Sequence, residues 1–304
     1  MSYTYHAYGL TIRVPFACPA LTPADTSCVT HAVDVVVREG PVPRRLRAPQ
    51  ASKASWDAAP GLFLLRGGRR AGRFLVEADA VTFERNSGCE DAILARHFTD
   101  QVLAALLRHC GLLVLHANAV EASDGVVVIG GESGAGKSTT LAALLDRGCR
   151  MLSDDVTALR LAGAPGSVEV LPGAAQTHLT EDAAEGLGYL VDPAQLQPWR
   201  RMKAAIPTHE GMALRAGRLR ALYKLRLSRG DDVVVTQVNG GDKFHALQEC
   251  IYGPMFAEEH PALFSLMSTV VAAVPFFWLE RPAGRWSIGE VADAILGSVP
   301  ELVP

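Results

Sequence analysis

The sequence predicts an α/β protein with a β-rich N-terminal part. Two patterns lead to this expectation. Short alternating apolar segments, separated by prolines and small polar residues, fill residues 1–88, and apolar strands alternating with helical patterns follow from residue 112. An amphipathic helical pattern lies between them. We therefore expect a β-rich part over residues 1–88, a linking helix over 89–111 and an α/β domain over 112–304.

The composition predicts a globular chain that can bury a core. The 304 residues are 49% hydrophobic and 20% charged. Twenty-nine Lys and Arg stand against 32 Asp and Glu, and this net charge of -3 argues against a nucleic-acid partner. The six cysteines show no zinc-ligand spacing and are typical of reduced thiols. No signal-peptide pattern opens the chain, so we expect a cytoplasmic protein.

The elements of the first part follow from residue type and turn signals. Strands are expected over residues 3–14, 31–38, 62–65, 73–77 and 80–84. The helix expected over 90–110 has its apolar residues on one face, acidic residues in its first turn and Gly111 just past its end. The basic residues at 44–47 and 66–73 either meet an acidic partner or lie in solvated turns.

In the second part, strands and helices alternate. Strands are expected over 112–115, 126–130, 151–152 and 233–238, and helices over 139–146, 243–251 and 288–296. Residues 161–218 are rich in Gly, Pro and Ala, with a short helix over 176–187, and suggest a substrate-facing insertion. The uncharged run 261–279 approaches the length of a bilayer span. Because it contains Pro275 and polar residues, we expect a helix ending near Ala273 followed by a strand, and no membrane contact.

The strongest chemical signal is a complete G-x-x-x-x-G-K-S motif between an apolar strand and a helix. Its residues are Gly131, Glu132, Ser133, Gly134, Ala135, Gly136, Lys137 and Ser138, followed by Thr139. Glycines let backbone N–H groups turn inward around phosphates, and the helix N-terminus adds a favourable dipole. Lys137 brings charge to the phosphates, and the Ser138 hydroxyl is placed to reach a Mg²⁺ ion. The alternative is a glycine turn without a ligand.

Two adjacent carboxylates, Asp154 and Asp155, follow the next short apolar run. Adjacent side chains point in different directions, so one carboxylate can reach Mg²⁺ while the other accepts a proton from an incoming hydroxyl. We assign the metal to Asp154 and the base to Asp155. A solvated turn is the alternative.

Other polar residues near this motif are further candidates. His116 ends an apolar run before the loop strand and either orients a carboxylate, donates to an oxygen or is merely held in place. Several basic residues could reach a transferred phosphate, and spacing does not choose among them: Lys224, Arg226, Arg229, Arg281 and Arg285.

As an ordered set, these residues resemble the kinase core of HPr kinase/phosphorylase. The set comprises Leu115-His116-Ala117, the loop 130–138, and Asp146-Arg147-Gly148 leading to Asp154-Asp155. The resemblance covers about fifty residues. It implies the fold shared with phosphoenolpyruvate carboxykinase, the cofactors ATP and Mg²⁺, transfer to a serine hydroxyl, and catalytic roles for His116, Lys137 and the Asp154-Asp155 pair.

The chain also departs from that family. Thr139 stands where the family has an acidic residue, and Ala117 stands where it has a glycine. The family's Asn-Ile-Arg-Gly-Leu-Gly-like signature further along the chain is not evident. We therefore expect a kinase without the phosphorylase activity. Residues 5–10 and the β-rich part resemble HPr-kinase-like proteins found beside ribosomal-peptide biosynthesis genes. These include kinases that phosphorylate the terminal serine of lasso-peptide precursors.

The sequence therefore favours an ATP- and Mg²⁺-dependent kinase that acts on a serine of a peptide or protein. Two alternatives stay open: a nucleotide-binding ATPase switch without phosphoryl transfer, and a small-molecule kinase. The expected partner is a peptide or protein with an acceptor serine, and the sequence does not decide between a monomer and a homo-oligomer.

Overall fold

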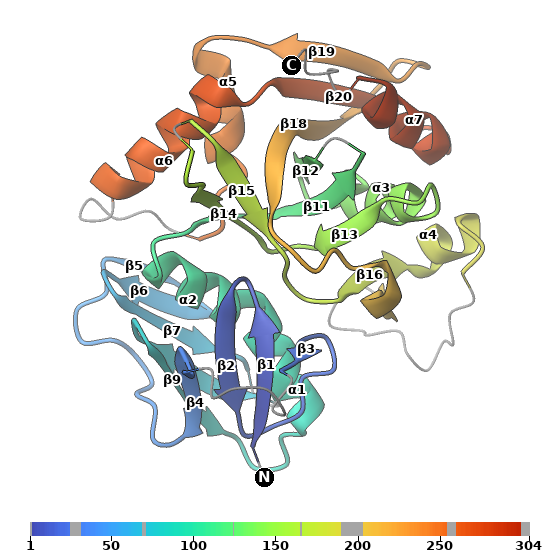
Figure 1. Cartoon of the computed structure of the whole chain (residues 1–304). Coiled ribbons are helices and arrows are strands. Elements are labelled where there is room, and N and C mark those ends of the chain that lie inside the picture. Colours follow the sequence, from blue (N-terminus) through green and yellow to red (C-terminus); the bar gives the residue numbers. More distant parts are fainter. Residues whose placement is uncertain are drawn as a thin grey trace. The chain divides into compact units, whose positions relative to one another are not determined.

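The computed structural model describes residues 2–24, 32–68, 71–123, 125–164, 166–189, 203–253 and 260–298 (Figure 1). The chain forms two compact units. Unit 1 comprises Met1–Val114 and Tyr252–Leu266, and unit 2 comprises Leu115–Ile251 and Met267–Pro304. The helix expected as a linker over 89–111 thus lies within unit 1, and a later segment of the chain returns to that unit.

Unit 1 contains a mixed sheet with the strand order β3-β1-β2-β4-β9-β8-β7-β6-β5. The pairs β2–β4 and β4–β9 are parallel. The strands are β1 (Tyr3–Ala7), β2 (Leu10–Val14), β3 (Thr22–Pro23), β4 (Val35–Glu39), β5 (Ala51–Lys53), β6 (Trp56–Ala59), β7 (Leu62–Arg66), β8 (Gly72–Val76) and β9 (Ala80–Arg85). The predictions over 62–65, 73–77 and 80–84 are confirmed. The strand expected over 31–38 begins only at Val35, and residue 31 lies outside the described residues.

The helix predicted over 90–110 is confirmed as one continuous run. It comprises α1 (Asp91–His97), a π-helical turn η1 (Phe98–Val102) and α2 (Leu103–His109). The hydroxyl of Thr99, in this turn, donates to the Ala95 carbonyl of α1 at 3.0 Å. Phe98 is fully buried and meets the ring of Phe16 edge-on, so the predicted apolar face packs into the core of unit 1.

Unit 2 is built on a second mixed sheet, with the order β14-β15-β18-β12-β11-β13 and with β20 and then β19 beside β18. The pairs β12–β18 and β18–β20 are parallel. The strands are β11 (Ala117–Ala122), β12 (Gly125–Gly131), β13 (Arg150–Ser153), β14 (Thr157–Leu161), β15 (Val168–Leu171), β18 (Gly217–Ser228), β19 (Val234–Val238) and β20 (Phe276–Pro282); β10 (Leu113–Leu115) spans the border between the units. The β12 strand, which leads to the glycine-rich loop, therefore lies inside the sheet.

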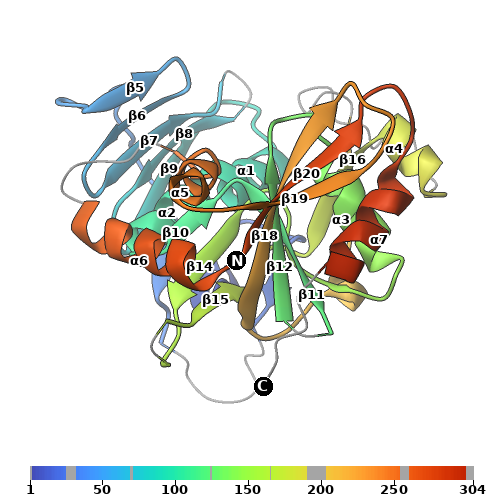
Figure 2. The same ribbon diagram turned by 90° about the horizontal axis from the view of Figure 1, so that it is seen from above.

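Helices pack on this sheet. Figure 2 shows α3 (Lys137–Leu145) and α7 (Ile288–Ser298) side by side, and their apolar residues share one core with β12 and β18. Two further helices are α5 (Gly241–Gln248), in unit 2, and α6 (His260–Ala273), which the border between the units divides. The prediction that 261–279 is a helix followed by a strand is confirmed by α6 and β20. In the part of the chain that the structure describes, no helix is both long and apolar enough to cross a bilayer.

The segment 161–218 differs from expectation. The short helix predicted over 176–187 is instead a strand, β16 (Gln176–Thr180), followed by α4 (Glu181–Gly186). β16 pairs antiparallel with β17 (Lys203–Pro207), and a 3₁₀ turn (His209–Gly211) follows. Thr180 ends the strand and caps the helix, because its hydroxyl accepts from the Ala183 N–H. Residues 190–202 of this segment lie outside the described residues.

Candidate functional site

The glycine-rich loop joins β12 to α3, as the motif requires. Gly136 caps α3 with φ 103°, a left-handed conformation that favours glycine. At Gly131 a Cβ would lie 2.8 Å from the Leu225 carbonyl oxygen, so a side chain is excluded there as well. The loop therefore brings the first N–H groups of α3 to one place, which is a favourable site for an anion.

Lys137 is the first residue of α3, and its ammonium group folds back over the loop. Its Nζ donates to the carbonyl oxygens of Gly131 at 2.9 Å and Glu132 at 3.3 Å. The residue is 6% exposed. Burial lowers the pKa of Lys137, and the nearby charges of Asp155 and Asp154 oppose that shift. The structure thus holds a cation above the loop.

Asp154 follows β13 and is buried against three donors. Its Oδ1 accepts from the Ser138 hydroxyl at 3.2 Å, and its Oδ2 accepts from the Thr177 hydroxyl at 2.7 Å and the His178 N–H at 3.0 Å. Burial and the neighbouring Asp155 raise the pKa of Asp154 to about 6, whereas the Thr177 and His178 donors lower it. The hydroxyl of the loop and the first carboxylate therefore meet, although 16 positions separate them.

Asp155 adopts a left-handed backbone conformation, with φ 65°. Its N–H donates to Asn118 Oδ1 at 3.3 Å, and its carbonyl oxygen lies 3.2 Å from His116 Nδ1. Because a carbonyl oxygen only accepts, His116 donates through a protonated Nδ1. Two side chains from the region before the loop thus hold the peptide groups on either side of the second carboxylate.

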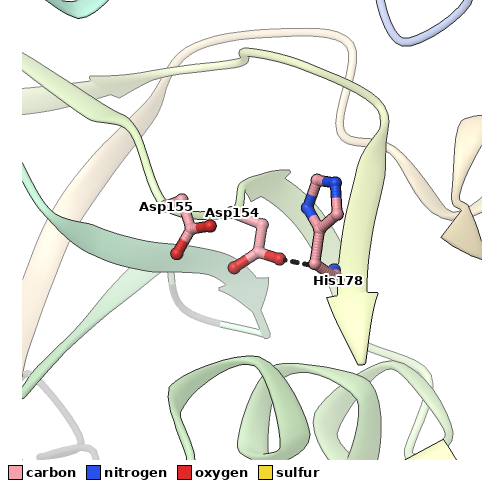
Figure 3. A group of neighbouring side chains, drawn as sticks. All are labelled: Asp154, Asp155 and His178. Atoms are coloured by element: carbon pink, nitrogen blue, oxygen red, sulfur yellow. Dashed lines mark hydrogen bonds between the residues drawn. The ribbon is translucent and has the colours of Figure 1, made fainter. Parts of the chain in front are cut away.

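Asp154, Asp155 and His178 form a group that can hold a metal ion. Each offers one ligand atom, and these atoms lie within 4.8 Å of one another (Figure 3). Carboxylate and hydroxyl oxygens are the ligands that Mg²⁺ prefers, and the Ser138 hydroxyl lies against Asp154. The residues present therefore fit a divalent cation beside the loop.

The loop and Asp155 face a common cavity of about 390 Å³. The loop contributes Ser133, Gly134, Gly136, Lys137, Ser138 and Thr139, and opposite them lie His116, Asp155 and His178. Gly131, Glu132, Ala135 and Asp154 are not among the residues that line it. A cavity of this size is typical of small-ligand sites.

Arg281, at the end of β20, also lines this cavity. Its Nε donates to the Ala135 carbonyl at 2.8 Å, and burial lowers its pKa. Three of the other basic candidates do not line this cavity and contact other side chains. Lys224 pairs with Glu249, and Arg285 pairs with Glu290. The Cζ atom of Arg226 lies 3.3 Å from the centre of the Trp278 ring.

Sequence reasoning missed several residues of the site. Thr177 and His178 on β16, Lys203 on β17 and Trp286 before α7 belong to no motif. Thr177 and His178 reach Asp154 across 23 and 24 positions because the chain folds back, and no spacing rule connects them. The β16 sequence Gln-Thr-His-Leu-Thr shows no apolar–polar alternation, so it gave no signal for these residues.

Comparison with known proteins does not identify a family for this chain. No family model matches the sequence, and no curated protein matches it. Among solved structures, the HPr(Ser) kinase/phosphatase from Coxiella burnetii is similar over 60% of this chain and 91% of that chain, with 14% identity and a TM-score of 0.32. This likeness is too low to assign the chain to that protein's family.

Proposed function

We propose that this protein is an ATP- and Mg²⁺-dependent kinase that transfers phosphate to a serine hydroxyl of a peptide or protein. The observation that supports it most is the hydrogen bond between Ser138 and Asp154, beside the Lys137 ammonium. A loop hydroxyl, a buried carboxylate and a cation at one helix N-terminus are the parts from which phosphoryl-transfer sites are built. The resemblance of the ordered motifs to HPr kinase/phosphorylase points the same way.

Each residue has a role in this proposal. The loop N–H groups and Lys137 bind the phosphates, and Arg281 adds a second cation at the start of α3. Ser138 and Asp154 hold Mg²⁺, which neutralises phosphate charge. Asp155 faces the cavity and accepts the proton of the acceptor hydroxyl. His116 is a positioning residue, because it binds the Asp155 carbonyl.

For the acceptor, the proposal rests on the resemblance of residues 5–10 and the β-rich part to HPr-kinase-like proteins found beside ribosomal-peptide biosynthesis genes. We propose a serine at the flexible end of a peptide, such as the C-terminal serine of a lasso-peptide precursor. A flexible end can enter an open cavity without unfolding its carrier.

The test is phosphoryl transfer from labelled ATP. Purified protein is incubated with Mg²⁺, ATP and peptides that end in serine, with matched peptides that end in alanine as controls. Label on the serine peptides alone supports the proposal. ATP hydrolysis without labelled peptide contradicts it and favours a nucleotide switch, and label on a small hydroxyl compound alone favours a small-molecule kinase.

The Lys137→Ala variant checks that transfer occurs at this loop. We expect a loss of a hundredfold or more in rate, because the variant lacks a cation aimed at charge that develops in the transition state. The matched control is Lys53→Ala, which removes an exposed lysine of β5 in unit 1. Unfolding curves of both variants check the fold. Wild-type turnover by Lys137→Ala would contradict the assignment.

A further inference from the structure

Trp286 presents an indole ring to the cavity that the loop and Asp155 line. The residue is 51% exposed. An exposed tryptophan alone carries little meaning, because single apolar side chains are common on protein surfaces. Trp286, however, lies on the wall of a cavity that Lys137 and Ser138 also line, and this position makes it a candidate for ligand binding.

The surroundings of Trp286 hold it in place. Arg285 donates to the Asp231 carbonyl at 3.1 and 2.7 Å and to Glu290 Oε2 at 2.8 Å. Ser287 on the other side is buried and accepts the first helical hydrogen bond of α7, from Val291. The ring also packs on Gly186 of α4, where a Cβ would lie 2.8 Å from it. The ring is therefore preorganised, which reduces the entropy lost when a ligand binds.

The sheet order sets the direction of a ligand in this cavity. On one side of β12 lie β11 and β13, after which come Asp154 and Asp155. On the other side lie β18 and β20, and β20 carries Arg281 and leads to Trp286. The reacting phosphate must lie near Asp155, which lines the cavity. A phosphate chain bound along the loop therefore has its opposite end on the side of Arg281 and Trp286.

We propose that Trp286 stacks on the purine base of the nucleoside triphosphate and so sets the affinity for nucleotide over bare polyphosphate. This inference rests on the proposed function, because it takes ATP as the phosphate donor. A flat aromatic ring stacks well on a base, whichever purine it is. Arg281 then contacts the phosphates nearest the base, and Trp286 contacts the base itself.

The experiment compares two ligands that differ in the base. Binding of ATP and of inorganic tripolyphosphate, each with Mg²⁺, is measured by calorimetry on wild type, Trp286→Ala, Trp286→Leu and Trp286→Phe. We expect Trp286→Ala and Trp286→Leu to weaken ATP binding by roughly tenfold or more and tripolyphosphate binding by less than about twofold. Trp286→Phe should stay near wild type. Trp56→Phe, in unit 1, controls for the loss of an indole, and Trp286→Leu retains apolar bulk should the alanine variant unfold.

Other outcomes overturn the inference. Equal weakening of both ligands would show that Trp286 acts through the shape of the loop. Unchanged ATP binding with a raised KM for the acceptor peptide would place the acceptor, and not the base, on the ring. If wild type binds tripolyphosphate but not ATP, the base has no site here. If wild type binds neither ligand, the proposed function fails as well, and the two failures are thereby told apart.

Discussion

Asp154 and Asp155 are neighbours in the sequence with different surroundings. Asp154 is buried against the Ser138 hydroxyl, whereas Asp155 is half-buried and lines the cavity. We expect Asp155→Asn to bind Mg·ATP with near-normal affinity and to transfer phosphate at least a hundredfold more slowly, because the base is lost. Asp154→Asn should need more Mg²⁺ for half-maximal rate. Rates against Mg²⁺ concentration, with ATP binding measured separately, distinguish the two. If both variants stay active, the pair is only a turn.

Asp155 combines a left-handed backbone conformation with a carboxylate in the site, and the two features can be tested separately. Glycine adopts φ 65° without the steric cost that a Cβ brings. We expect Asp155→Gly to be more stable than Asp155→Ala by about 1 kcal/mol, while both lose transfer activity to the same extent. Urea unfolding curves and transfer rates measure the two effects. Equal stability of the variants would mean that the surrounding structure, and not residue 155, absorbs the strain.

The sequence predicted part of the surroundings of these carboxylates. The loop and the carboxylate pair stand in a fixed order that is visible in one dimension, and the structure places Ser138 against Asp154. The donors Thr177 and His178 come from a strand whose pairing depends on tertiary packing. The conformation of Asp155 was equally out of reach, because it depends on His116 and Asn118 binding its peptide groups.

At the scale of elements, β12 packs closely against the turn that follows α5. A Cβ at Gly130 would lie 2.5 Å from the sulfur of Cys250, which is a buried free thiol. We expect Gly130→Ala to destabilise unit 2 by about 1–3 kcal/mol through overpacking. Cys250→Ala removes the sulfur, so the double variant should recover part of that loss. A double-mutant cycle in urea tests this expectation, and simple additivity would contradict it.

Long periodic elements were predictable, whereas some of the short ones were not. The helix over 90–110 and the helix–strand segment over 261–279 were found because many apolar positions repeat with one period. β6 has the sequence Trp-Asp-Ala-Ala and shows no such repeat. β16 was mistaken for part of a helix because its five residues run directly into α4. In these short elements, pairing partners outweigh local propensity.

At the scale of the whole molecule, basic side chains for which the sequence left an external partner open bind a carboxylate of the same chain. In unit 1, the carboxylate of Asp57 is fully buried, and Arg66 and Arg45 each bind it at about 3.0 Å. Two arginines from the basic stretches 44–47 and 66–73 therefore bind an internal partner. The Leu46 N–H donates to the same carboxylate at 3.1 Å.

This cluster predicts an acid-sensitive contribution to stability. Burial raises the pKa of Asp57, but the donors outweigh it and lower the pKa from 3.8 to about 2. The folded state thus binds the proton less readily than the unfolded state, so the contribution is present above pH 4 and disappears as the pH falls towards 2. We expect Asp57→Asn to be less stable than wild type at pH 5 and the difference to shrink by pH 2.5. Urea unfolding at both values tests this, with the exposed Asp79→Asn as control.

A difference between wild type and Asp57→Asn that is the same at both pH values would show that the cluster acts through packing alone. A difference that grows on acidification would reverse the sign of the argument, because it would mean that the folded state binds the proton more readily.

Unit 1 is assembled from two stretches of chain that are separated by most of unit 2. It therefore cannot be completed on the ribosome before most of unit 2 has been synthesised. Residues Met1–Val114 emerge first, but the last part of the unit, Tyr252–Leu266, emerges only after the loop, the carboxylates and most of unit 2. Domains generally fold as units during synthesis, starting from the N-terminus. Here neither unit is complete until Leu266 has been synthesised, so a nascent chain arrested before Leu266 should carry no finished unit.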